Sequence, residues 1–214
     1  MNIRSEVVDF VYDKLYPIYA TFDKGHDVNH IDAVIRRALE LYEYLGDETL
    51  DINVLYAAAA LHDIGIQVQR KGHAQYSQEY VLNCDDLKNL FTPEEIVLIG
   101  EAVADHSTSV GREPRSIYGK IVCDADKDDD LETSLLRAYE FSVAYNPDFS
   151  LQECLDDTYK HLQEKYGDEG KVKYWINSDK QCEFKEKMHS VALNRELFDQ
   201  TMVGILKKQK CVVK

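Results

Sequence analysis

The sequence predicts an all-α protein, and three observations lead to that prediction. Apolar residues recur at intervals of three and four along most of the 214 residues, which is the spacing of one helix face. The four prolines and ten glycines lie mainly between these periodic segments. Alternation with a period of two, the pattern of a half-buried strand, is nearly absent. We therefore expect helices nearly throughout.

Two amphipathic helices are expected before the first central segment. The first covers residues 7–15 and ends near Pro17. The second covers residues 31–42, where apolar side chains follow one face, and ends at Gly46.

The most apolar segment of the chain is residues 54–61 (VLYAAAAL), which is apolar almost all round and predicts a central buried helix ended by Gly65. Residues 92–95 (TPEE) carry the signals of a helix start: a threonine cap, a proline in the first turn and a glutamate three residues after the cap. This helix is expected to reach His106.

The next periodic segment, residues 117–122, leads into two aspartates, Asp124 and Asp126, and the periodicity continues over residues 131–139. Between these segments lies the acidic run 128–130. We interpret this run either as a solvated helix face or as a contribution to a metal site.

The dipeptide Asn146-Pro147 is a strong helix breaker and the best place to divide the chain. It separates a helical core, residues 1–146, from a C-terminal helical extension, residues 147–214, that we expect to pack on the core. The extension should hold a helix over residues 151–162 and an amphipathic stretch over residues 188–206, which Asn194 and Arg195 interrupt.

Composition narrows the classes of partner. Lys and Arg number 25 against 39 Asp and Glu, a net charge of −14, so no basic stripe is available for a nucleic-acid backbone. No apolar run approaches the roughly 20 residues of a membrane span, and the first residues lack the apolar stretch of a signal peptide. The five cysteines form no CxxC pair. We expect a reduced, cytoplasmic protein without nucleic-acid or membrane partners, and a homodimer stays open.

The candidate metal ligands lie next to apolar segments. His62 and Asp63 follow the most apolar helix, where ionisable side chains need a partner because an uncompensated buried charge is costly. His30 lies on the edge of an apolar helix face, and Asp126 follows Ile121-Val122 closely. Two imidazoles and two carboxylates suit a divalent cation such as Mn²⁺, Fe²⁺, Co²⁺, Ni²⁺ or Mg²⁺.

Four segments in this order resemble the HD-domain metal-dependent phosphohydrolase superfamily. They are GHDVNHIDAVIRRAL (residues 25–39), LYAAAALHDIG (55–65), ADHSTS (104–109) and IVCDADK (121–127). The resemblance covers roughly residues 20–140. It implies an HD-domain helical bundle and assigns His30, His62, Asp63 and Asp126 as metal ligands, with His106 near the site.

The sequence also departs from the family's pattern. Many members carry a glutamate shortly after the His-Asp pair, whereas no carboxylate appears here before Glu79. Proton transfer must then fall elsewhere, and the candidates are Asp124, Asp105, His106 and the metal-bound water itself. We name Asp63, His106 and Asp124 as catalytic candidates, with Asp63 holding the metal and orienting that water. His73 and His106 could hold a second metal. Cationic and imidazole side chains near the motifs are candidate phosphate contacts: Lys71, His73, Arg112 and Lys127.

The predicted chemistry is metal-assisted hydrolysis of a small phosphorylated metabolite. The resemblance favours a nucleotide substrate, with the protein acting as a nucleoside triphosphate pyrophosphohydrolase or a nucleotidase. One alternative is a cyclic or linear phosphodiesterase on the same metal platform, which a second metal would favour. Another is a non-catalytic metal- or nucleotide-binding regulator, which the missing glutamate keeps open.

Overall fold

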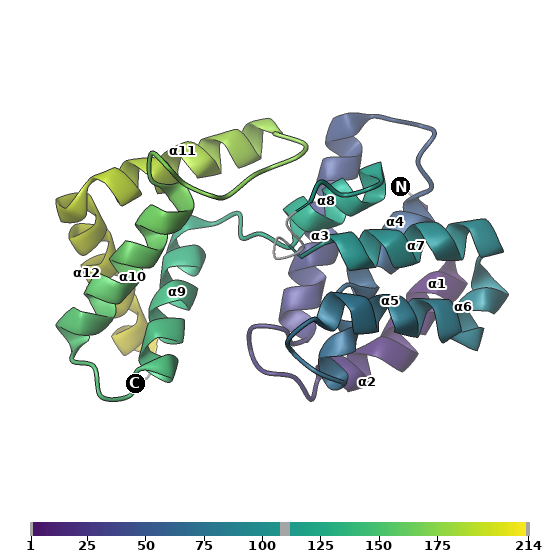
Figure 1. Cartoon of the computed structure of the whole chain (residues 1–214), viewed down its shortest axis with the longest axis horizontal. Coiled ribbons are helices and arrows are strands. Elements are labelled where there is room, and N and C mark those ends of the chain that lie inside the picture. Colours follow the sequence, from purple (N-terminus) through teal and green to yellow (C-terminus); the bar gives the residue numbers. More distant parts are fainter. Residues whose placement is uncertain (1, 108–111, 213–214) are drawn as a thin grey trace. The chain divides into compact units, whose positions relative to one another are not determined.

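The computed structural model describes residues 2–107 and 112–212, and within these ranges every regular element is a helix (Figure 1). The all-α prediction is confirmed. The chain divides into two compact units, Met1–Lys127 and Asp128–Lys214. The predicted division at residue 146 therefore differs from the one observed, because the helix before Asn146-Pro147 contacts the C-terminal helices.

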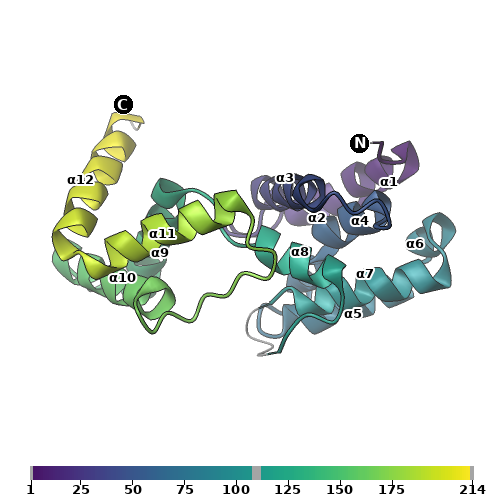
Figure 2. The same ribbon diagram turned by 90° about the horizontal axis from the view of Figure 1, so that it is seen from above.

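The N-terminal unit is built around one buried helix, α4, which contacts α3, α7 and α8 (Figure 2). Its elements in chain order are α1 (Ser5–Phe10), η1 (Val11–Leu15), α2 (Tyr16–Tyr19), α3 (Val28–Leu45), α4 (Ile52–Leu61), η2 (Ile64–Gln67), α5 (His73–Asn83), α6 (Asp85–Leu90), α7 (Pro93–Asp105) and α8 (Ile117–Ala125).

The buried character of α4 confirms the sequence prediction. Every side chain from Val54 to Leu61 is buried, so this helix has no solvent face. It begins at Asp51, whose carboxylate accepts a hydrogen bond from the backbone N–H of Asn53 at 2.7 Å. The helix ends at Leu61, which leaves His62 and Asp63 at the end of the most deeply buried segment of the unit.

The predicted end of α3 at Gly46 and the predicted start of α7 are confirmed, and the structure adds a cap at the start of α3 that the sequence reasoning did not name. Asp27 caps α3 by accepting hydrogen bonds from the N–H groups of Asn29 and His30. Gly46 follows α3 with a φ of 59°, a left-handed conformation that favours glycine. Thr92 and Glu95 form the predicted capping box at the start of α7.

Gly65 has a different role from the predicted one. It lies inside the short helix η2 rather than at the end of α4. A Cβ at this position would collide with backbone atoms of His73 and Ser77, and the Gly65 N–H donates to Ser77 Oγ at 2.8 Å. The glycine therefore allows η2 and α5 to approach closely.

The first helical run passes through Pro17 and ends at Tyr19, two residues beyond the predicted stop. The chain continues through η1 into α2, and Pro17 lies in the first turn of α2, where a missing N–H costs little. Tyr19 at the end of α2 is fully buried, and its hydroxyl donates to the carbonyl of Ala60 at 2.8 Å. The first segment is thus fixed against the end of α4.

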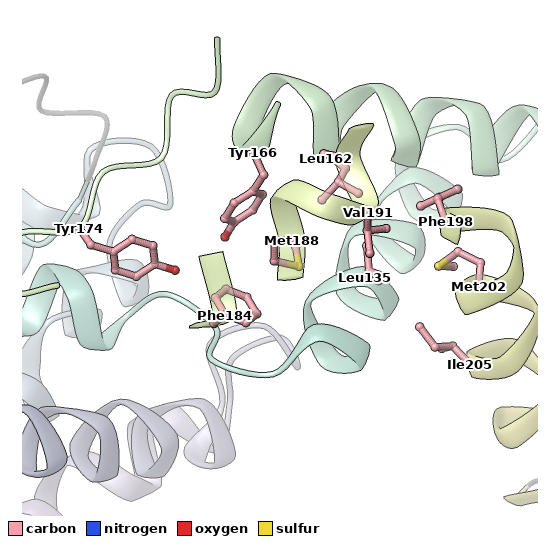
Figure 3. Close-up of a cluster of buried hydrophobic side chains, with 11 residues drawn as sticks. Leu135, Leu162, Tyr166, Tyr174, Phe184, Met188, Val191, Phe198, Met202 and Ile205 are labelled. Carbon is pink, nitrogen blue, oxygen red and sulfur yellow. The ribbon is translucent and has the colours of Figure 1, made fainter. Parts of the chain in front are cut away.

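The C-terminal unit contains four helices around a core of its own: α9 (Leu131–Tyr145), α10 (Leu151–Tyr166), α11 (Asp179–Leu193) and α12 (Arg195–Val212). Figure 3 shows this core, which includes Leu135, Leu162, Phe184 and Met202. The expected stretch over residues 188–206 is two helices, because the backbone at Asn194 is extended.

The acidic run 128–130 belongs to this unit and is used for structure. Asp130 caps α9 by accepting from the N–H of Thr133, while Asp128 pairs with Arg137 and Asp129 with Lys180. Among the described residues, no helix is both long and apolar enough to span a bilayer.

Candidate metal centre

Six side chains of the N-terminal unit converge because they sit at the ends of five helices. His30 lies in the first turn of α3, and His73 is the first residue of α5. The other four follow directly after helices: His62 and Asp63 after α4, His106 after α7 and Asp126 after α8. Helix ends place side chains at a common point without a continuous polar helix face, which is why the flanking segments could stay apolar.

The first half-site consists of His30, His62 and Asp126 together with one oxygen of Asp63. The Nε2 atoms of His30 and His62 are 3.3 Å apart. Asp126 Oδ1 lies 3.2 Å from His30 Nε2 and 3.6 Å from His62 Nε2. Asp63 Oδ2 lies 3.5 Å from His30 Nε2 and 3.2 Å from His62 Nε2. These four residues are the ones the sequence predicted as metal ligands.

The second half-site consists of His73 and His106 together with the other oxygen of Asp63. The two Nε2 atoms are 3.0 Å apart. Asp63 Oδ1 lies 3.0 Å from His73 Nε2 and 3.5 Å from His106 Nε2. The carboxylate of Asp63 therefore stands between the half-sites and turns one oxygen toward each.

Backbone carbonyls fix the orientation of three rings. His62 Nδ1 contacts the carbonyl of Ala59 at 2.8 Å, and His106 Nδ1 contacts that of Val103 at 2.6 Å. His73 Nδ1 contacts the carbonyl of Arg70 at 3.0 Å. Since a carbonyl oxygen only accepts, each Nδ1 must carry the proton, which leaves the Nε2 lone pair of a neutral ring directed at the centre.

This donor set fits divalent cations. In each half-site the Nε2 lone pairs of two imidazole rings face each other at short distance. Two such lone pairs repel unless a proton or a cation lies between them. The Asp63 side chain is only 4% exposed, and a carboxylate this buried requires compensating positive charge. Imidazole and carboxylate ligands together suit Mn²⁺, Fe²⁺, Co²⁺ or Ni²⁺, and the carboxylates also suit Mg²⁺.

Without a metal ion, protons take the place of the cations. Burial opposes protonation of the rings, but the carboxylates outweigh it and raise the pKa of His62 to about 10 and that of His30 above its ordinary value. The surrounding rings hold the pKa values of Asp63 and Asp126 well below the usual range, despite burial that acts in the opposite direction. Metal binding must therefore displace protons from the rings.

Arg37 is a site residue that the sequence analysis missed. It is buried on α3, two turns after His30, and its Nε donates to the carbonyl of Ala125 at 2.6 Å. That carbonyl ends α8 and directly precedes Asp126. Arg37 thus ties the helix that carries His30 to the helix end that carries Asp126. Its only sequence signal is a cation within an otherwise apolar helix face.

Three other predicted site residues, Lys127, Asp124 and Arg112, have structural partners. Lys127 Nζ donates to Asp124 Oδ1 at 2.9 Å, and the Asp124 side chain is fully buried. Arg112 donates to Asp105 Oδ1 at 2.7 Å.

Asp105 is also fully buried, and it accepts further hydrogen bonds from Arg115. Burial alone would raise the pKa of this carboxyl, but the two arginines hold it below its ordinary value. Lys71 is exposed in the turn before α5.

Comparison with known proteins gives one match. Residues 28–131 match the family model of the HD domain. No curated protein and no solved structure matches the chain. The matched segment begins in the first turn of α3 and ends at the start of α9, and it contains all six residues of the two half-sites.

Proposed function

Through residues 28–131 the chain belongs to the HD-domain superfamily, and from this premise we propose that it is a metal-dependent phosphohydrolase with a two-metal centre. The observation that carries the proposal is the position of Asp63. Its two oxygens face two separate pairs of imidazole nitrogens. If two divalent cations bind, Asp63 would offer one oxygen to each of them, and such a pair of cations would supply the chemistry of a two-metal hydrolytic centre.

When bound, divalent ions supply positive charge that polarises a phosphoryl oxygen and favours deprotonation of a water molecule at neutral pH. The chain itself holds and orients the ligands. The carbonyls of Ala59, Val103 and Arg70 fix three imidazole rings in the tautomer that binds metal. Arg37 fixes the end of α8 and hence Asp126.

Two of the ligands reach solvent. The side chains of His62 and His106 are 0% and 1% exposed, whereas that of Asp126 is 33% exposed and that of His73 is 20% exposed. We propose that a substrate approaches the centre past Asp126 and His73, because the other ligands among the described residues are nearly or fully buried.

For the substrate we propose a small phosphorylated metabolite, with a nucleotide as the leading candidate. The nucleotide assignment is supported by the sequence resemblance. The chain carries a net charge of −14 and would repel an anionic substrate. We therefore expect such a substrate to bind only when cations occupy the centre. Two divalent ions would supply the local positive charge that the acidic surface lacks.

The second half-site also favours a second candidate, a cyclic or linear phosphodiesterase on the same centre. Two-metal sites stabilise both the attacking and the leaving oxygen of an in-line displacement, which suits the opening of a diester. The two candidates share every ligand and differ in the substrate they accept.

A hydrolysis panel tests the proposal. Metal-stripped protein is incubated with nucleoside triphosphates, monophosphates and cyclic nucleotides, with Mn²⁺, Co²⁺, Ni²⁺ or Mg²⁺ added back, and the products are identified. Pyrophosphate from a triphosphate supports a pyrophosphohydrolase, inorganic phosphate from a monophosphate a nucleotidase, and opening of a cyclic nucleotide the phosphodiesterase.

Two variants control the panel. Asp63→Asn should abolish turnover, whereas Asp86→Asn, which alters an exposed carboxylate paired with Lys14 in the same unit, should leave it unchanged. Absence of turnover with every metal, in a protein that still binds metal, would replace the proposal with a regulatory role.

A further inference from the structure

Two loops meet on the solvent side of the metal centre through an ion pair that none of the roles above explains. Asp23 lies between α2 and α3, and Arg70 lies between η2 and α5. Arg70 donates from one terminal guanidinium nitrogen to Asp23 Oδ2 at 2.7 Å. The other oxygen of Asp23 contacts His26 Nδ1 at 2.9 Å.

This pair connects the two half-sites. The backbone carbonyl of Arg70 holds the ring of His73, which belongs to the second half-site. The ring of His26 lies 5.9 Å from the ring of His30, which belongs to the first half-site. The contacts therefore run from one half-site to the other over the rim of the centre.

Both side chains of the pair reach solvent close to the centre. The side chains of Asp23 and Arg70 are 50% and 56% exposed, in contrast to the buried metal ligands. The neighbouring His73 is also among the more exposed ligands. The guanidinium of Arg70 is therefore accessible to solvent, and its partner Asp23 contacts His26, the ring next to His30.

The cost of releasing the present partner distinguishes Arg70 from two other cations near the motifs, Arg112 and Lys127. Arg112 pairs with the fully buried carboxylate of Asp105, and Lys127 pairs with that of Asp124. If either cation turned to a substrate phosphate instead, a buried carboxylate would lose a positively charged partner, which is costly. The Arg70–Asp23 pair is exposed at both ends, and exposed ion pairs contribute little to stability. Arg70 can therefore exchange its partner at small cost.

We propose that Arg70 is the phosphate-binding side chain at the rim of the metal centre, and that Asp23 holds its guanidinium in place until a substrate phosphate takes over. This inference rests on the proposed function, since it assumes a phosphorylated substrate. A guanidinium matches the geometry of a phosphate because it can donate two parallel hydrogen bonds. Asp23 acts as a competing anion, so its removal should strengthen phosphate binding.

The test measures binding of labelled inorganic phosphate to the full-length, metal-loaded protein by equilibrium dialysis. Arg70→Gln should raise the Kd for phosphate about 10- to 100-fold, because a charge-assisted hydrogen bond is lost. Arg70→Lys should recover part of the affinity, since a point charge remains without the bidentate geometry. Asp23→Asn should lower the Kd by up to about fivefold, the range of an exposed ion pair.

Matched controls separate phosphate recognition from structural damage. Arg36→Gln removes another exposed arginine, which pairs with Glu40 on the same unit, and should leave the phosphate Kd unchanged. Metal content should be the same in all variants, because Arg70 contacts His73 only through its backbone carbonyl.

The outcomes distinguish this inference from the proposed function. If phosphate binding depends on Arg70 while the protein hydrolyses no phosphorylated compound, the inference stands and the proposed function fails. If the protein is an active hydrolase but Arg70→Gln changes the phosphate Kd less than twofold, the inference is overturned alone. A metal-loaded wild-type protein that binds no phosphate overturns the inference as well.

Discussion

The Nε2 atoms of His73 and His106 lie 3.0 Å apart, and a backbone carbonyl holds the opposite nitrogen of each ring. Two neutral imidazoles held in this way direct lone pairs at each other. Asp63 Oδ1 approaches the same point from a third direction. These three groups could hold a cation, with one ligand fewer than the four of the first half-site.

Removal of either histidine should therefore eliminate one of two bound metal ions. We expect His73→Ala and His106→Ala to bind one equivalent of Mn²⁺ after dialysis, against two for the wild type, because His30, His62 and Asp126 are untouched. Elemental analysis of the dialysed proteins measures the stoichiometry. His161→Ala, in the C-terminal unit, is the control and should retain two equivalents. Retention of two equivalents by both His73→Ala and His106→Ala would exclude the second site.

The stability of the metal-free protein should fall as the pH rises above neutrality. The pKa of His62 is raised from its ordinary value of 6.5 to about 10, so its stabilising contribution is complete below pH 6.5 and is lost as the pH rises through about 10. Denaturant unfolding of metal-free protein at pH 6, 8 and 10 should show a decreasing free energy of unfolding. In His62→Gln the decrease should be smaller. A free energy that is constant from pH 6 to 10 would contradict this account.

At acid pH the stability of the metal-free protein should depend on pH in the opposite direction. The pKa values of Asp63 and Asp126 lie well below the ordinary value of 3.8, so their contribution to stability is present above that pH and is lost as the pH falls through the folded-state values.

Metal affinity should increase with pH through the neutral range, because each metal ion displaces protons from the rings. Proton release measured during metal titration in two buffers checks this.

A methyl group at Gly65 should disrupt the second half-site. In Gly65→Ala the new Cβ would collide with backbone atoms of His73 and Ser77, and overpacking of this kind costs about 1–3 kcal/mol. We expect a lower free energy of unfolding and weaker binding of the second metal ion. Gly204→Ala is the matched control, because a Cβ at Gly204 meets no atom within 4 Å in helix α12, so that alanine should be neutral or stabilising there. Equal stability of the two variants would refute the packing role of Gly65.

Arg37 should act on one half-site only. In Arg37→Met the hydrogen bond to the carbonyl of Ala125 is lost, and Asp126 is the only ligand that follows this carbonyl directly. Loss of an orienting partner typically reduces metal affinity about 10- to 100-fold. In a metal titration we expect this loss of affinity at the first half-site, and an unchanged affinity at the second half-site. Equal weakening of both half-sites would indicate a general structural role instead.

Local sequence signals predicted the elements that carry the first half-site. The apolar periodicity over residues 31–42 and the stop at Gly46 predicted α3, and the apolar run over residues 54–61 predicted a helix without a solvent face. Both signals act within a few residues and need no tertiary information. The order of four motifs then identified His30, His62, Asp63 and Asp126, which the structure brings together.

The elements and residues of the second half-site could be recognised only from tertiary contacts. The sequence analysis predicted no helix over α5 and α6, because few of their side chains are buried and the apolar stripe is too thin to recognise. The approach of His73 to His106 depends on the packing of η2 against α5 at Gly65, which spacing alone does not specify. The partners of Arg112 and Lys127 likewise became visible only when Asp105 and Asp124 were found to be buried.

If both half-sites bind a metal ion, Asp63 would hold one ion with each of its oxygens, and anomalous diffraction from crystals of the Mn²⁺-loaded protein tests this directly. We expect two anomalous peaks about 3.5–4 Å apart, the separation typical of two-metal hydrolytic centres. One peak should lie among His30, His62 and Asp126 and the other between His73 and His106, each next to a different oxygen of Asp63. A single peak, or two peaks that do not share Asp63, would contradict the account.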